Sequence, residues 1–265
     1  MDDASLTCTH LNVGGVATQM AVLGSGPPLL FLHGGEGPLT PSDRYLRLLA
    51  RTHRVIAPFH PGFGPTELPA DFRDVNDLAY FYLELAEKFS LADAVLCGAS
   101  FGGWVAAEIA VRNTARFSRL ILVDPLGIKV SDRETRDIAD IYALGAEDLI
   151  KASYHRPEIA ARDTTAMSDA DLMAIARSRE ALCYYGWQPY MHNPQLLRWL
   201  HRIDVPTLVL WGAQDRIVSP DYGRAYAAAI PGARFSLIEA AGHYPYTEQP
   251  EEFAAQVAAF ARVTA

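Results

Sequence analysis

Residues 94–110 constrain the fold more than any other stretch of the chain. Ala94-Val95-Leu96 is a short apolar run of β-forming residues, and the residues after Gly103 have the alanine-rich pattern of a helix. The Gly-x-Ser-x-Gly sequence of residues 98–102 lies between them, so the segment reads as strand, tight turn and helix. A Cβ at Gly98 or Gly102 would collide where strand and helix pass closely. We therefore predict that the turn holds Ser100 with its hydroxyl clear of the sheet, as a nucleophile.

Length, charge and cysteine content exclude several classes of protein. A chain of 265 residues suits an α/β domain with a substantial core, and its formal net charge of -8 argues against nucleic acid or an anionic membrane as main partner. The first residues lack a signal-peptide pattern, and the three cysteines have no metal-like spacing. We expect a cytoplasmic protein with a small-molecule substrate and with no metal or organic cofactor. The sequence leaves a homo-oligomer open.

The order of predicted elements indicates the architecture. An antiparallel pair of strands before Leu23 is followed by buried strands that alternate with helices, which predicts a mostly parallel sheet with helices on both faces. Residues 127–200 contain no β-rich run but do contain helical patterns, at Arg133–Leu144 and Asp169–Tyr184. We predict a core made of residues 1–126 and 201–265, with residues 127–200 inserted as a helical cap over the site.

Several short motifs follow one another in a fixed order. They are His33-Gly34-Gly35, Pro61-Gly62-Phe63-Gly64, the turn around Ser100, Trp211-Gly212-Ala213-Gln214-Asp215, and Gly242-His243 ahead of Glu248-Gln249-Pro250. In this order they resemble the α/β-hydrolase fold superfamily over essentially the whole chain apart from the insertion. The resemblance implies an eight-stranded, mostly parallel sheet and a helical cap.

The resemblance also assigns a catalytic triad. It implies that Ser100 is the nucleophile, His243 the base and Asp215 the acid, in the chain order that this superfamily uses. The chemistry agrees, because a serine hydroxyl needs a base near neutrality and the imidazole needs a carboxylate to hold its tautomer. All three residues follow predicted strands, so in a parallel sheet they meet at its carboxyl edge.

Backbone amides of Gly35 and Phe101 are the expected oxyanion hole. Glycine at position 35 allows close approach of a donor, and Phe101 begins the helix after the nucleophile. We expect His33 to brace this loop by hydrogen bonding. His60 stands where related sequences commonly carry Asp, and we interpret it as structural.

Each assignment has a structural alternative. Ser100 can be a turn serine, Asp215 a loop cap and His243 a surface histidine, while Asp124 is a rival acid because it also ends a strand. Pro125 directly after Asp124 favours Asp215. Beyond the triad, the residues that we expect at the pocket are His33, Gly34, Trp187 and Tyr244.

A serine nucleophile limits the classes of reaction that the protein can catalyse. Haloalkane dehalogenases and epoxide hydrolases of this fold need aspartate at the position of Ser100, so serine indicates acyl transfer. Carbon–carbon hydrolases of ring-fission products usually carry Trp after the triad histidine, where this chain has Tyr244. We predict a serine hydrolase of a small, partly apolar ester, thioester or lactone. The alternatives are a carbon–carbon hydrolase, a cofactor-free perhydrolase and a ligand-binding receptor.

Overall fold

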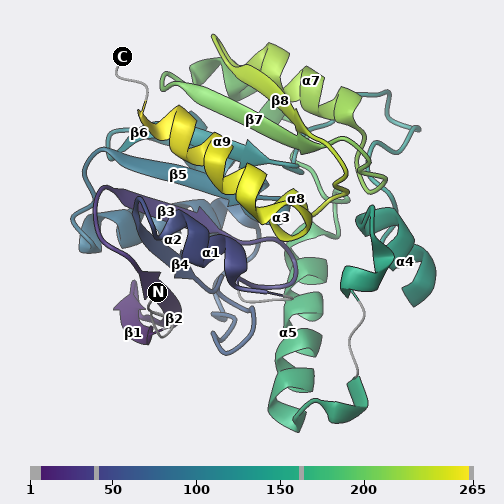
Figure 1. Ribbon diagram of the computed structural model, residues 1–265, viewed down its shortest axis with the longest axis horizontal. Helices are drawn as coiled ribbons and strands as arrows, with labels where there is room; N and C mark the ends of the chain where they lie inside the picture. The colour runs from purple at the N-terminus through teal and green to yellow at the C-terminus, as the bar shows by residue number, and fades with distance from the viewer. Residues whose placement is uncertain (1–6, 39–41, 161–163, 263–265) are drawn as a thin grey trace.

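An eight-stranded sheet forms the centre of the computed structural model, which describes residues 7–38, 42–160 and 164–262 (Figure 1). The strand order across the sheet is β1-β2-β4-β3-β5-β6-β7-β8. The strands are β1 (Thr7–Val13), β2 (Val16–Leu23), β3 (Pro28–Leu32), β4 (Arg54–Pro58), β5 (Ala94–Ala99), β6 (Phe117–Val123), β7 (Thr207–Gly212) and β8 (Arg234–Ile238).

Burial of the strands follows their position in the sheet. β2 pairs antiparallel with β1 and β4, whereas every other pairing is parallel, from β4 through β3 to β8. All residues of β5 and β7 are buried, as expected for strands covered by helices on both faces. The predicted eight-stranded, mostly parallel sheet with helices on both faces is therefore confirmed.

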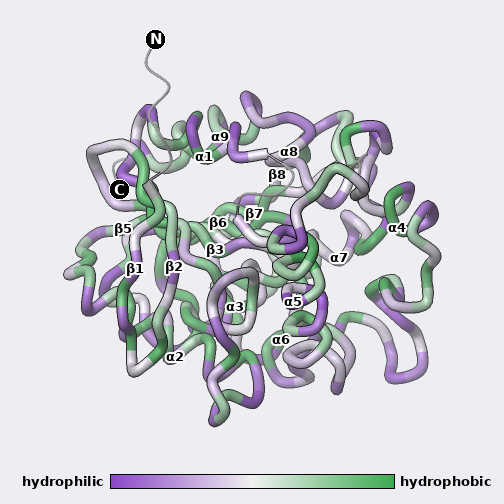
Figure 2. The backbone as a smooth tube through the Cα atoms, turned by 90° about the horizontal axis from the view of Figure 1, so that it is seen from below, coloured by the Kyte–Doolittle hydropathy of each residue, from purple (hydrophilic) through white to green (hydrophobic). Residues whose placement is uncertain are grey.

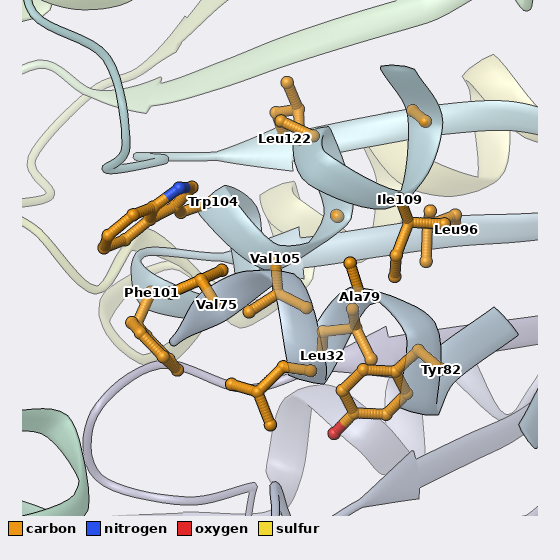
Figure 3. Packing of buried hydrophobic residues seen from close by; sticks show 14 of the residues in the cluster. Leu32, Val75, Ala79, Tyr82, Leu96, Phe101, Trp104, Val105, Ile109 and Leu122 are labelled. Carbon is orange, nitrogen blue, oxygen red and sulfur yellow. The ribbon is translucent and has the colours of Figure 1, made fainter. Parts of the chain in front are cut away.

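Helices cover the two faces of the sheet and enclose separate core clusters. One face carries α2 (Val75–Lys88), α3 (Phe101–Arg112) and α7 (Pro220–Ala229), and the other carries α1 (Arg44–Leu49), α8 (Pro245–Glu248) and α9 (Pro250–Arg262). Figure 3 shows the first cluster, in which side chains of α2 and α3 pack on Leu32, Leu96 and Leu122 of the central strands.

The segment between β6 and β7 contains helices joined by turns and irregular stretches. It contains α4 (Ala146–Ser153), the long α5 (Asp169–Gly186), α6 (Leu196–Trp199) and the 3₁₀ turns η1 (Pro157–Ala160), η2 (Thr164–Ala166) and η3 (Leu200–Arg202). Figure 1 shows α4 and α5 together at one side of the sheet. The expected helix over 169–184 is present as α5.

The helix predicted at Arg133–Leu144 is wrong. That stretch consists of turns and bends, and Ile138 forms a β-bridge with Val218. The carboxylate of Asp132 accepts the backbone N–H groups of residues 134 and 135, and Asp137 accepts those of residues 130 and 131. Such short-range side-chain bonds offer the backbone an alternative to helical hydrogen bonds.

Hydropathy follows the layers of the fold. In Figure 2 the more hydrophobic segments gather around the central strands, and the most hydrophilic ones lie on outer turns and loops. Within the described ranges, every helix is too short or too polar to cross a lipid bilayer.

Candidate active site

Ser100 occupies a strained turn between β5 and α3. Its backbone has φ 52° and ψ -116°, a conformation that is costly for a residue with a side chain. A Cβ added to Gly98 would lie 2.3 Å from the carbonyl oxygen of Gly102, and one added to Gly102 would lie 2.2 Å from that of Leu32. Neither position has room for a side chain, so the glycine spacing is what permits the turn.

Ser100, His243 and Asp215 form a hydrogen-bonded chain with the geometry of a catalytic triad. Ser100 Oγ lies 2.8 Å from His243 Nε2, and His243 Nδ1 lies 2.7 Å from Asp215 Oδ2. The three residues are buried, with Ser100 5% exposed and His243 3% exposed. The structure thus brings together three residues that are far apart in the sequence.

Asp215 is held by the turn that follows β7. Its Oδ1 accepts the backbone N–H groups of Ile217 at 2.8 Å and Val218 at 3.1 Å, which leaves Oδ2 to face His243. One carboxylate oxygen therefore binds the backbone and the other binds the histidine ring. The two backbone amides orient the carboxylate toward His243.

The loop that carries His243 is fastened to the segment after α4. The backbone N–H of His243 donates to the carbonyl oxygen of Ser153 at 2.7 Å. Glu248, which is buried, accepts backbone N–H groups from Gly242 at 2.6 Å, Arg156 at 2.8 Å and His155 at 3.1 Å. One carboxylate therefore joins the histidine loop to the inserted segment.

Asp124, the rival acid, ends β6 and lies beside the triad without being hydrogen-bonded to His243. Its Oδ1 accepts the N–H of Gly212 at 2.8 Å. Complete burial, and then the nearby charge of Asp215, raise the pKa of Asp124 well above its usual value, so its environment favours the protonated form. Potential metal-ligand atoms of Asp124, Asp215 and His243 lie within 4.8 Å of one another, but the hydrogen bond between the latter two already uses one atom of each.

Two free amides lie near the nucleophile. A Cβ added to Gly34 would be 3.3 Å from Ser100 Cβ, which places the loop after β3 against the serine. In the part of the chain that the structure describes, the N–H groups of Gly35 and Phe101 donate to no protein acceptor. Phe101 is the first residue of α3, so its amide also lies at the positive end of the helix dipole.

Helix α5 covers this loop and its neighbour. A Cβ on Gly35 would lie 2.6 Å from Cδ2 of Leu182, so that side chain contacts the loop directly. Farther along the helix, Ser178 Oγ accepts the N–H of Gly64, and the Tyr185 hydroxyl donates to the carbonyl of Pro61. Helix α5 therefore contacts the loops after β3 and β4 through Leu182, Ser178 and Tyr185.

The remaining expected pocket residues divide into two groups. His33 is buried and donates from Nδ1 to the carbonyl oxygen of Gly34 at 2.6 Å, and the Tyr244 ring lies 5.3 Å from that of His243. Trp187 is 58% exposed and packs on Tyr142, outside the buried set around Ser100.

Two contributors to the site carried no sequence signal for their roles. Leu182 was one apolar residue of a helical pattern, and Glu248 was part of a short motif without an assigned partner. Both act through contacts between segments that are distant in the sequence.

Comparison with known proteins places this geometry in a family. The chain is 28% identical over 258 residues to a 2-hydroxy-6-oxo-6-(2'-aminophenyl)hexa-2,4-dienoic acid hydrolase of Metapseudomonas resinovorans, covering 92% of this chain and 87% of that protein. It is 26% identical over 276 residues to a pimeloyl-[acyl-carrier protein] methyl ester esterase of Nitrosospira multiformis, covering 94% of this chain and 100% of that protein.

Structural similarity agrees with the sequence matches. A serine hydrolase involved in carbazole degradation superposes with a TM-score of 0.78 at 23% identity, covering 97% of this chain and 98% of that one. The model of the alpha/beta hydrolase family matches residues 29–256, which include the whole hydrogen-bonded chain from Ser100 to Asp215. The protein is therefore a hydrolase that belongs to the alpha/beta hydrolase family.

Proposed function

We propose that the protein hydrolyses a small, neutral, partly apolar carboxylic ester through an acyl-enzyme on Ser100. The observation that carries this proposal is the hydrogen-bonded chain from Ser100 Oγ through His243 to Asp215, next to two unpaired amides. The hydrogen bond from Ser100 gives His243 Nε2 the place of the base, while Asp215 holds the other ring nitrogen as donor.

The reaction follows from these positions. Ser100 Oγ attacks the ester carbonyl while His243 Nε2 takes its proton, and the oxyanion accepts the N–H groups of Gly35 and Phe101. Protonated His243 then gives its proton to the leaving alkoxide, and the carbon–oxygen bond breaks to leave the acyl-enzyme. Water, deprotonated by His243, attacks the acyl group and releases the acid with Ser100 restored.

Charges around the site favour a neutral substrate. Among the described residues, the buried Asp, Glu and His side chains have no buried lysine or arginine beside them. Asp215 is a carboxylate directly behind His243, and Glu248 is a second one behind the histidine loop. A substrate carboxylate would meet negative charge and, among the described residues, find no buried lysine or arginine to pair with.

A carbon–carbon hydrolase is the second candidate, because one relative is named as a dienoic acid hydrolase. Such a substrate carries a carboxylate, and the acidic surroundings of Ser100 weigh against it. Residues 127–200 are proposed as the cap, supported by the contact between Leu182 of α5 and Gly35.

A panel of p-nitrophenyl esters with short to long acyl chains tests the proposal, with one ring-fission dienoate included. We expect repeated turnover of esters that Ser100→Ala abolishes and that Ser118→Ala, at a serine bonded only to a backbone carbonyl, leaves intact. Rapid cleavage of the dienoate with feeble ester turnover would move the assignment to carbon–carbon bonds. A single acylation without turnover would indicate a receptor.

A further inference from the structure

Two buried histidines pack against each other behind the oxyanion loop. His33 follows β3 and His60 follows β4, and their ring centroids are 3.9 Å apart. Both side chains are shielded from solvent, at 1% and 0% exposure. Neither ring takes part in the hydrogen-bonded chain of the triad, so the reaction described above does not use them.

Hydrogen bonds fix the proton positions on both rings. The backbone N–H of His60 donates to His33 Nε2 at 2.9 Å, so that nitrogen is an acceptor and the proton of His33 sits on Nδ1. That Nδ1–H faces the carbonyl oxygen of Gly34 at 2.6 Å. In the second ring, His60 Nε2 faces the carbonyl oxygen of His33 at 2.8 Å and must donate, which leaves Nδ1 to accept the hydroxyl of Tyr82 at 2.5 Å.

The hydrogen bonds run in one direction from the core to the loop. The hydroxyl of Tyr82 on α2 donates to the His60 ring, whose Nε2–H donates to the carbonyl oxygen of His33. The backbone N–H of His60 donates to the His33 ring, which in turn donates to the carbonyl oxygen of Gly34. Figure 3 shows Tyr82 within the packed cluster, with Leu32 between it and Phe101. Burial lowers the pKa of both histidines, that of His60 to about 4, so both rings are neutral at neutral pH and keep these tautomers.

The last hydrogen bond, from His33 to Gly34, holds the peptide unit between Gly34 and Gly35. The carbonyl of Gly34 and the N–H of Gly35 belong to the same planar trans peptide and point in opposite directions. A bond that holds the carbonyl toward His33 therefore holds the N–H away from it. Glycines on both sides give this peptide unusual freedom to rotate, so its orientation needs an external constraint. Gly37 N–H also reaches this carbonyl oxygen, but at 3.3 Å.

We propose that Tyr82, His60 and His33 form a positioning relay that holds the Gly34–Gly35 peptide with its N–H aimed at the oxyanion. The relay rests on the proposed function, since it serves the oxyanion formed after attack by Ser100. Its members are positioning residues, because they touch the loop and not the substrate.

The test compares variants that remove the last donor with one that keeps it. His33→Leu deletes the bond to Gly34, and we expect kcat to fall about 100-fold with little change in KM, which is the effect of losing one oxyanion donor. Affinity for a trifluoromethyl ketone, which mimics the tetrahedral intermediate, should fall in parallel. His33→Asn keeps an N–H donor near the Nδ1 position and should recover at least about tenfold of the lost kcat.

Matched controls separate positioning from stability. His53→Leu removes another buried histidine, bonded to Thr52 just before β4, and should keep kcat even if it lowers the melting temperature. Tyr82→Phe removes one oxygen at the far end of the relay and should lower kcat about three- to tenfold. Tyr222→Phe, which removes a buried hydroxyl bonded to Ile128, should not.

The outcomes distinguish this relay from the proposed function. A folded His33→Leu protein with kcat and inhibitor affinity within threefold of the parent overturns the relay, while an inactive Ser100→Ala leaves the serine mechanism standing. If His33→Leu does not fold, Tyr82→Phe decides, and a kcat equal to that of Tyr222→Phe overturns the relay. Retained activity in Ser100→Ala refutes the proposed function instead.

Discussion

Replacing Asp215 by Asn tests how the carboxylate sets the histidine tautomer. The amide has one acceptor and one donor end, and the backbone decides which end faces His243. Oδ1 of Asp215 accepts two N–H groups, from Ile217 and Val218, so the amide oxygen must occupy that side. The NH₂ group then faces His243 Nδ1, which becomes an acceptor, and the ring proton moves to Nε2, where it cannot receive the proton of Ser100.

The magnitude follows from the cost of turning the amide over. In the flipped, productive orientation the NH₂ group would face two buried N–H donors and leave them without an acceptor, at about 2 kcal/mol each. With a total cost of about 4 kcal/mol, only about one molecule in 10³ has its amide in the productive orientation. Trapping the wrong tautomer in a serine hydrolase costs about 10⁴ in kcat, so we expect a loss between about 10³ and 10⁴.

The assay is kcat on the best ester of the panel, with the melting temperature recorded for each variant. Asp124→Asn is the companion variant, because it changes an equally buried carboxyl beside the same histidine. Burial favours the uncharged form of Asp124, so an uncharged amide that keeps its oxygen on the N–H of Gly212 should hold kcat within about threefold. The reasoning is refuted if Asp215→Asn loses less than tenfold, or if both variants lose activity equally.

Three further predictions concern the cap, the histidine loop and pH. Leu182→Ala should move the acyl-chain optimum of the ester panel toward longer chains, because it removes the side chain against Gly35, whereas Met173→Ala on the exposed face of α5 should not. Glu248→Gln sets an NH₂ group against backbone donors and should lower the free energy of unfolding by about 2–4 kcal/mol, measured by urea denaturation, and lower kcat as well. The pKa of His60 falls from 6.5 unfolded to about 4 folded, so the unfolded chain binds the extra proton and stability is lost as pH falls from 6.5 toward 4. Between pH 7 and pH 4.5, urea denaturation should show a smaller loss for His60→Gln than for the parent, and equal losses would contradict the assigned pKa.

The sheet and the chemistry around Ser100 could be predicted from short sequence patterns. Strand β5 is wholly buried, and the glycines that flank the serine are required by contacts within a few residues or with the adjacent strand. Asp215 and His243 end up near the serine because parallel strands bring their carboxyl ends to one edge. Such consequences of strand order can be predicted without knowledge of side-chain packing.

Other features depend on contacts that no local pattern encodes. The segment 133–144 has helical spacing of apolar residues, yet Asp132 and Asp137 bind its backbone and the predicted helix does not form. No motif in the sequence connects Tyr82 with His60, and only the fold shows its hydroxyl bonded to that ring. Trp187 was expected at the pocket, but its side chain faces solvent beside Tyr142.

The three buried acids of the site are stabilised in different ways, and their charge affects how the site binds substrate and product. Asp215 accepts two backbone amides and faces His243, Glu248 accepts three backbone amides, and burial raises the pKa of Asp124 and so favours its protonated form. A neutral ester entering this environment meets no opposing charge. Its acid product is an anion, formed at Ser100 with only the His243 ring between it and Asp215, and no lysine or arginine among the described residues is buried to hold it. Hydrolysis of a neutral ester therefore converts a ligand that the site accepts into one that it repels, and the acyl product should be a weak inhibitor compared with an uncharged ester analogue of the same length.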